Sequence, residues 1–232
     1  MTRFDKILLG SFLAVWVWAA IAPKYRHDWL LENLLVFIFV PVIIFGGRYF
    51  KLSELSFALL TVFMITHVVG SHYTFAEVPF GYTLQAWTGA SRNMYDRLVH
   101  FLFGLLLAYP FREIFLRVAR VKGFWAYYFP FDICLSMSAA YEIIEWMAAS
   151  IVNPQAGLAF LGTQGDIWDA QKDILWGGAG AAIAMVVIAL INWRYDPNFA
   201  RDLKESFRIR RVETPRGDSR LKQWFGPSSA GL

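Results

Sequence analysis

Long apolar runs separated by short polar segments occupy most of the chain. A helix that crosses a bilayer needs about 20 predominantly apolar residues, and six runs approach or exceed that length. They cover residues 7–22, 30–46, 57–72, 98–115, 124–151 and 174–193. This pattern predicts an all-α fold, a polytopic membrane helix bundle of about six transmembrane helices that forms one domain over residues 1–193.

The first run is short and follows the basic residues Arg3 and Lys6. A basic start before an apolar stretch is typical of a secretory signal peptide, and the Ala-Ile-Ala motif at 20–22 would suit its cleavage. Pro23 follows this motif directly and disfavours cleavage. We therefore expect the first run to remain in the protein as a span.

The composition agrees with a membrane protein. Hydrophobic residues make up 57% of the chain and charged residues 17%, against roughly 25% charged residues in soluble domains. Cys134 is the single cysteine, so the chain cannot form an internal disulfide framework or a cysteine metal cluster. The net charge of +4 comes from residues between the apolar runs and in the tail, and we therefore expect no nucleic-acid partner.

The basic residues also predict the orientation. The segments on one side of the predicted spans, including both termini, carry 17 lysines and arginines, whereas those on the other side carry 5. Basic residues are retained on the cytoplasmic side of a membrane. The sequence therefore predicts that both termini are cytoplasmic.

Residues 194–232 differ in character from the runs before them. Phe199, Leu203 and Phe207 are spaced by four residues among arginines and lysines, which predicts a short amphipathic helix on the anionic inner leaflet. From about Thr214 onward the composition favours disorder. We expect a basic cytoplasmic juxtamembrane tail, partly disordered, with membrane lipids as its partners.

Acids and histidines gather at the predicted outer ends of four spans. They are His67 and His72 in the third run, Asp96 and His100 near the start of the fourth, Glu142 and Glu145 in the fifth, and Asp166, Asp169 and Asp173 at the start of the sixth. Spacings of three and four residues put the members of each group on one helical face. A charge buried in a bilayer costs at least about 2.5–3.5 kcal/mol, so we expect these groups to face the bundle interior and to pair with a cation. Arg92, Arg97 and Lys172 are the local cations, and a divalent metal is the alternative.

This mixture of groups suggests metal chemistry. Imidazole with carboxylate suits zinc, manganese or iron, and carboxylates alone suit magnesium or calcium. The candidate metal ligands are Asp96, His100, Glu142, Asp166, Asp169 and Asp173; the candidate catalytic groups are Glu142, Glu145 and His100; the candidate substrate-binding groups are His67, His72, Arg92 and Lys172. The leading hypothesis is an outward-facing pocket for metal-dependent hydrolysis or transfer on a lipid-linked or envelope substrate.

Two other functions fit the same residues. In a transporter the acids and histidines would relay protons or ions, and polar residues should then continue toward the cytoplasmic side. Few do so, and Asp132 in the fifth run is the main one. In a membrane scaffold the polar groups would only tie the helices together, and the basic tail would be the functional part.

Two further segments bear on access and packing. Residues 73–93 form the longest outer loop, which we expect to be irregular, and its aromatic residues suggest an interfacial lid over the pocket. Residues 177–182 contain only glycine and alanine, which lets neighbouring helices approach the sixth span closely. The Asp face before this stretch should therefore be held rigidly.

Four motifs resemble the YjdF-type bacterial inner-membrane proteins. They are HVVGSHYTFAEVP (67–79), RNMYDRLVHFLFGLLLAYP (92–110), YEIIEW (141–146) and FLGTQGDIWDAQKD (160–173). The resemblance implies a multi-pass protein of the bacterial inner (cytoplasmic) membrane, and that family is itself a domain of unknown function.

A more distant resemblance is to VanZ-like membrane proteins, which are associated with glycopeptide resistance. They also begin a span with Asp-x-x-x-His, here Asp96 and His100. They follow with a glutamate late in the next span and an aspartate before a last span rich in small residues. The resemblance implies that the three helices carrying these residues meet.

Overall fold

The computed structural model describes residues 2–47, 49–151 and 162–208. Within these residues the protein has eight α-helices, one short 3-10 helix and no strand, so the predicted all-α fold is confirmed. The elements are α1 (Arg3–Ala20), α2 (Arg26–Gly46), α3 (Glu54–Tyr73), η1 (Phe75–Glu77), α4 (Pro79–Thr88), α5 (Tyr95–Arg117), α6 (Trp125–Ile151), α8 (Asp169–Tyr195) and α9 (Phe199–Ser206).

Each of the six predicted runs coincides with a long helix. By length and composition, α2, α3, α5 and α8 are able to cross a membrane. The other two long helices, α1 and α6, are not among these candidates. Helix α1 has Arg3, Asp5 and Lys6 within its 18 residues, and α6 combines Asp132 and two glutamates with tyrosines, serines and a proline. The described chain therefore contains four candidate spans and two further long helices packed beside them.

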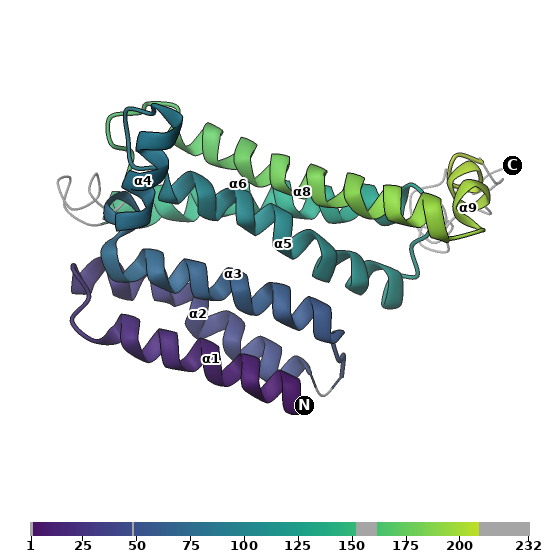
Figure 1. Cartoon of the computed structure of the whole chain (residues 1–232), viewed down its shortest axis with the longest axis horizontal. Coiled ribbons are helices and arrows are strands. Elements are labelled where there is room, and N and C mark those ends of the chain that lie inside the picture. The colour runs from purple at the N-terminus through teal and green to yellow at the C-terminus, as the bar shows by residue number, and fades with distance from the viewer. Residues whose placement is uncertain (1, 48, 152–161, 209–232) are drawn as a thin grey trace, which may run out of the picture.

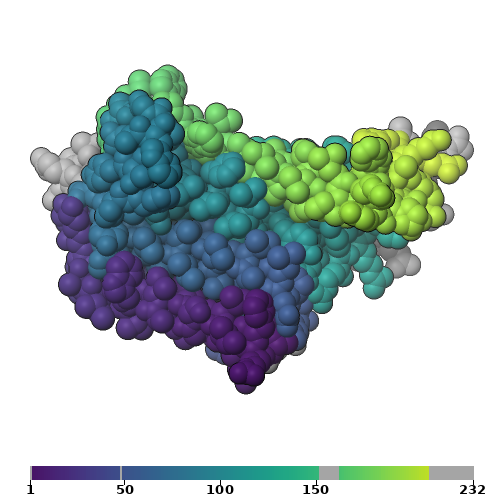
Figure 2. All heavy atoms as spheres, in the orientation of Figure 1, coloured from purple at the N-terminus to yellow at the C-terminus, as the bar shows by residue number. Residues whose placement is uncertain are grey.

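The six long helices form two groups that lie side by side (Figure 1). In the first, α1 and α2 pack against α3, around a core that includes Phe12, Val36 and Val68. In the second, α5, α6 and α8 pack against one another, with Ala108 and Cys134 in the core. Contacts between α3 and α5 join the groups, which the space-filling view shows as one continuous body (Figure 2).

Glycines allow α5 and α8 to approach closely. A Cβ added at Gly104 would clash with the backbone carbonyl of Gly177, and one added at Gly180 would clash with the carbonyl of Phe101. Small residues at such positions permit backbone contact between membrane helices. The predicted thin stretch of the sixth run therefore fixes the start of α8 against α5.

The segment 73–93 is more ordered than we expected. It contains η1 and the ten-residue α4, where the sequence predicts an irregular loop. Pro79 lies at the first turn of α4, where its missing N–H is tolerated, and Gly89 ends the helix in the left-handed conformation with φ of 67°. These start and stop signals were present in the sequence, and the expectation of an irregular loop was wrong.

The start of the basic tail is helical, as predicted. Helix α9 covers Phe199–Ser206, and it packs on the beginning of α6. The backbone N–H of Phe124 donates to Ser206 Oγ at 2.9 Å, and the rings of Phe124 and Phe207 lie 5.1 Å apart. The predicted disorder from Thr214 onward falls outside the described residues.

Candidate functional site

Charged side chains from four long helices and from the segments before α5 and α8 converge at one end of the bundle. This end holds the starts of α2, α5 and α8 and the later parts of α3 and α6, and it lies opposite to the end where α1 begins and α9 lies (Figure 1). We define the polar cluster as Glu32, Arg92, Asp96, Arg97, His100, Tyr141, Glu142, Glu145, Asp166, Asp169 and Asp173. The convergence predicted from the sequence is therefore present.

Two arginines, Arg92 just before α5 and Arg97 near its start, bind most of the aspartates. Arg97 forms ion pairs with Asp166, Asp169 and Asp173, and its side chain is only 4% exposed. Arg92 pairs with Asp169 and, at 3.4 Å, with Asp96. The two guanidinium groups therefore share Asp169 between them, and they join the beginning of α5 to the beginning of α8.

The same arginines also hold the turn that precedes α8. Arg92 donates to the carbonyl oxygens of Gly162 at 3.1 Å and Thr163 at 3.3 Å, and Arg97 donates to the carbonyl of Asp169 at 3.0 Å. The side-chain oxygen of Gln164 accepts the backbone N–H of Asn93 at 2.9 Å. One end of this turn is thus bound to the segment that leads into α5, and the other end is bound to Arg97 in α5.

Asp166 lies in this turn and not on the helix. Because α8 begins at Asp169, the prediction that Asp166 shares a helical face with Asp169 and Asp173 was wrong. The exposed Lys172 donates to both carboxylate oxygens of Asp166, at 2.7 and 2.9 Å. This hydrogen bond, with help from Arg97, lowers the pKa of the Asp166 carboxyl below its ordinary value.

A second part of the polar cluster surrounds His100. Its Nε2 lies 3.6 Å from Asp96 Oδ1 and 3.4 Å from Glu142 Oε1, the latter without the geometry of a hydrogen bond. Asp96, His100 and Asp173 each offer one ligand atom, and these three atoms lie within 4.8 Å of one another. Glu142 Oε1 and Asp173 Oδ1 are buried and have no hydrogen-bond donor among the described residues. The donors and the two unpartnered oxygens fit a divalent cation.

The balance of charges within the polar cluster is also compatible with a bound cation. The polar cluster contains seven carboxyl groups, whereas Arg92, Arg97 and Lys172 are the permanent cations that pair within it. Excess buried negative charge must be neutralised by protons, by His100 or by a bound cation. The imbalance is greatest on the side of Glu32, Glu142 and Glu145, since neither arginine forms an ion pair with these three residues within the described chain.

The sequence analysis missed Glu32 and Tyr141. Glu32 is 5% exposed and accepts a hydrogen bond from the hydroxyl of Tyr141 at 2.8 Å. Next to it, Asn33 donates to Ser71 Oγ at 3.2 Å and ties α2 to α3. The available signal was the pair Glu32-Asn33 within the second apolar run, because a carboxyl and an amide side chain are unfavourable on a helix face that contacts lipid.

The structure separates the two histidines of α3. His67 Nε2 lies 3.1 Å from the carbonyl oxygen of Glu32, at the edge of the polar cluster. His72 lies elsewhere: its ring stacks on Trp18 with centroids 4.4 Å apart, and its Nδ1 is 3.1 Å from the carbonyl oxygen of Ala19. His72 thus joins α3 to the end of α1, and it is not part of the polar cluster.

The other predicted site residues come together. Arg92, Asp96, His100, Glu142, Asp166, Asp169 and Asp173 contact one another directly, and Lys172 joins them through Asp166. Glu145 lies one turn beyond Glu142 on α6, close enough to interact electrostatically with Glu32 and Asp96. The side chains in these ion pairs are mostly buried, with exposures between 3% and 18% apart from Lys172. The cluster is therefore packed and interior.

Comparisons with known proteins match the chain to membrane proteins. A family model described as predicted membrane protein (DUF2238) matches residues 4–194, which include the whole polar cluster. The inner membrane protein YjdF of Escherichia coli (strain K12) is 37% identical over 202 residues, which is 84% of this chain and 95% of the relative. No solved structure matches the chain.

The resemblance drawn from the four sequence motifs is thus confirmed, whereas the more distant one to VanZ-like proteins stays a prediction. The family match covers all six long helices up to the last turn of α8, and the curated relative aligns over nearly its whole length. The chain belongs to the DUF2238 family of membrane proteins and is similar to the inner membrane protein YjdF of E. coli.

Proposed function

We propose that this chain is a multi-pass inner-membrane protein that binds a divalent metal in its polar cluster and uses it for hydrolysis or group transfer on a lipid-linked or envelope substrate. In this proposal all six long helices cross the membrane, both termini are cytoplasmic, and the polar cluster faces outward. The excess of lysine and arginine on the side of the termini supports the orientation.

The observation that carries the proposal is the arrangement around His100. Ligand atoms of Asp96, His100 and Asp173 lie within 4.8 Å of one another, and the buried Asp173 Oδ1 and Glu142 Oε1 have no hydrogen-bond partner in the described chain. A buried carboxylate oxygen without a donor is costly. A cation bound by these oxygens and by the imidazole would remove that cost.

The contacts also narrow the choice of ligands. Asp166 and Asp169 pair with cationic side chains and are not among the three residues whose ligand atoms lie close together, so we assign them to holding the turn before α8. Asp96, His100, Asp173 and Glu142 remain as ligands, and Glu145 is the nearby carboxylate that could exchange a proton with bound water. A metal in such a site polarises a carbonyl or phosphoryl oxygen or lowers the pKa of bound water. An imidazole with several carboxylates suits zinc, manganese or iron better than magnesium.

A transporter is the less favoured function. Between the polar cluster and the opposite end, α5, α6 and α8 are packed through Ala108, Cys134 and Ala181, all with no exposed surface. Toward that end, Asp132 is partly exposed and forms no ion pair or hydrogen bond with a described residue. These contacts do not favour a polar path through the second group of helices.

A scaffold function would place the activity in the basic tail. Removal of the residues after Arg194 separates this alternative from the other two, because a metal-binding cluster within residues 1–193 should keep its metal. Loss of metal on this truncation, with the protein still folded, would contradict the metal proposal.

The direct test is the metal content of the full-length protein purified in detergent, measured by elemental analysis. We expect about one transition metal per chain in the wild type and a loss of most of it in Asp173→Asn and His100→Ala. Glu54→Gln and His27→Ala are matched controls, because both residues are exposed and lie outside the polar cluster. The proposal would be rejected if the wild-type protein bound no metal after incubation with zinc, manganese and iron. It would also be rejected if all five proteins contained the same amount of metal.

A further inference from the structure

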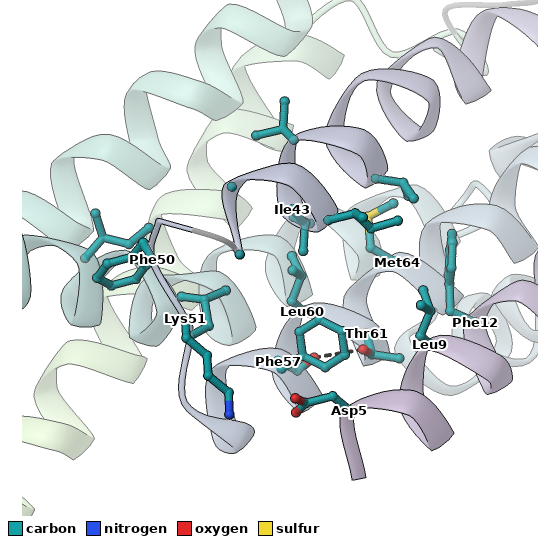
Figure 3. Close-up of a pocket in the computed structure, with 17 residues that line it drawn as sticks. Asp5, Leu9, Phe12, Ile43, Phe50, Lys51, Phe57, Leu60, Thr61 and Met64 are labelled. Carbon is teal, nitrogen blue, oxygen red and sulfur yellow. Dashed lines mark hydrogen bonds between the residues drawn. The ribbon is translucent and has the colours of Figure 1, made fainter. Parts of the chain in front are cut away.

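A separate cavity lies at the opposite end of the first group of helices. Its volume is about 450 Å³, and it is lined by α1, α2, α3, the residues that follow α2 and Ile114 of α5 (Figure 3). Ligand pockets in proteins commonly have volumes of about 300–1,000 Å³. The cavity is therefore large enough for part of a small molecule or for a hydrocarbon chain.

The cavity arises because α2 diverges from its neighbours. The buried residues of α2 all lie between Trp29 and Val36, and no residue of α2 beyond Val36 is buried. Pro41 lies in this second half, where a proline removes a backbone hydrogen bond and favours a bend. The second half of α2 thus leaves space between itself and the pair α1–α3.

The walls of the cavity are apolar and extend along the helices. Phe57 and Met64 line it from α3, and Phe12 lines it from α1. Seven residues separate Phe57 from Met64, which is about 10 Å along a helix. The hydroxyl of Thr61 donates to the carbonyl of Phe57 at 2.8 Å, drawn as a dashed line in Figure 3, and so it is already satisfied within α3.

The cavity opens on the lateral surface of the bundle. Val42 and Ile44 line it, and yet they are 59% and 48% exposed. On a helix that crosses a membrane, such exposed apolar side chains face lipid. A hydrocarbon chain would therefore reach the cavity from the bilayer without passing through water.

Two charged side chains of opposite sign lie at one end of these apolar walls. The carboxylate of Asp5 and the amine of Lys51 lie on the same side of the view in Figure 3. Asp5 Oδ2 accepts the backbone N–H of Thr2 at 2.7 Å, and Oδ1 makes no hydrogen bond within the described residues. Lys51 is exposed, and Arg117 donates to its carbonyl oxygen at 2.7 Å, which fixes the backbone. The amine of Lys51 forms no hydrogen bond or ion pair with any residue that the structure describes.

We propose that this cavity binds a phospholipid with an ethanolamine head group: one acyl chain lies between α1, α2 and α3, the amine of Lys51 binds the phosphate, and Asp5 binds the ammonium group. The combination of one anionic and one cationic side chain at the end of an apolar cavity complements a zwitterionic head group and not a purely anionic one. The site is independent of the polar cluster, since it lies at the other end of the bundle.

The test uses the full-length protein purified in mild detergent, with bound lipid counted by native mass spectrometry. We expect one phosphatidylethanolamine per chain in the wild type. Gly46→Phe should lose it, because Gly46 lines the cavity and a Cβ there meets no atom within 4 Å. Leu60→Trp fills the cavity from α3 and provides a second variant (Figure 3).

Gly10→Phe is the matched control, because Gly10 also has open space around its Cβ but does not line the cavity. Lys51→Gln should weaken binding of phosphatidylethanolamine roughly tenfold, the effect of one lost hydrogen bond to a charged group, whereas Lys6→Gln should not change it. Retention of lipid by both filled variants would overturn the proposal. The proposal would also be overturned if the protein bound phosphatidylglycerol, which lacks the ammonium group, more strongly than phosphatidylethanolamine.

Discussion

At the scale of single residues, Arg97 is the side chain on which the polar cluster depends most. It is 4% exposed and pairs with three aspartates from the turn before α8 and from α8 itself. Removal of one partner from a buried ion pair typically costs about 3–5 kcal/mol, because a charge is left uncompensated. We therefore predict that Arg97→Leu lowers the free energy of unfolding in detergent by about 3–5 kcal/mol.

The control for this prediction is Arg194→Leu, which makes the same change at an exposed position in the last turn of α8. Tryptophan fluorescence during denaturation would measure both variants. If the two substitutions had the same effect, the buried ion pairs would not hold α5 to α8.

Individual residues also show what could be predicted from the sequence. Asp96 with His100 and Asp169 with Asp173 were recognised because helical spacing puts each pair on one face of its helix. The contact of Glu32 with Tyr141 in α6 could not be predicted, because it joins residues 109 positions apart in the chain. His72 was assigned to the polar cluster only from its predicted depth in the membrane. That depth does not determine the direction in which a side chain points.

At the scale of elements, the contact between α5 and α8 brings the two halves of the polar cluster together. A Cβ at Gly104 would clash with backbone atoms of Gly177 and Ala181, whereas one at Gly178 would meet only the end of the Leu135 side chain. We predict that Gly104→Ala lowers the free energy of unfolding by about 1–3 kcal/mol, the range for an overpacked core. Gly178→Ala should be neutral or slightly stabilising, because alanine favours a helix more than glycine does.

Thermal unfolding followed by tryptophan fluorescence compares these two variants under identical conditions. An unchanged midpoint for Gly104→Ala would show that the two helices can separate at Gly104 without loss of stability. In that case the glycine contact would not position the Asp-bearing start of α8.

The elements themselves were largely predictable, since hydrophobic length alone located all six long helices. The ends of these helices and the segments that connect them were not predictable in this way. Helix α4 has the ordinary signals of Pro79 and Gly89, but its ten residues are too few to give a strong periodic pattern. The turn at 162–168 depends on hydrogen bonds from Arg92 and from the segment before α5, and such distant partners are not visible in a local sequence pattern.

At the scale of the whole molecule, the orientation in the membrane decides which substrates the polar cluster could meet. The cluster and α4 lie at one end of the bundle, and α9 lies at the other (Figure 1). The excess of basic residues at the end of α9 predicts that this end is cytoplasmic. Metal chemistry on an envelope substrate requires the polar cluster at the opposite surface.

Cysteine labelling in intact cells tests this orientation. In a Cys134→Ala background, Ala86→Cys in α4 and Ala200→Cys in α9 each introduce one thiol at an exposed alanine. We predict that a membrane-impermeant maleimide labels Ala86→Cys in intact cells and labels Ala200→Cys only after the membrane is permeabilised. The reverse result would put the polar cluster on the cytoplasmic side, where a metal-dependent enzyme would meet cytoplasmic substrates. The basic residues near α9 would then lack the anionic inner leaflet that explains their position.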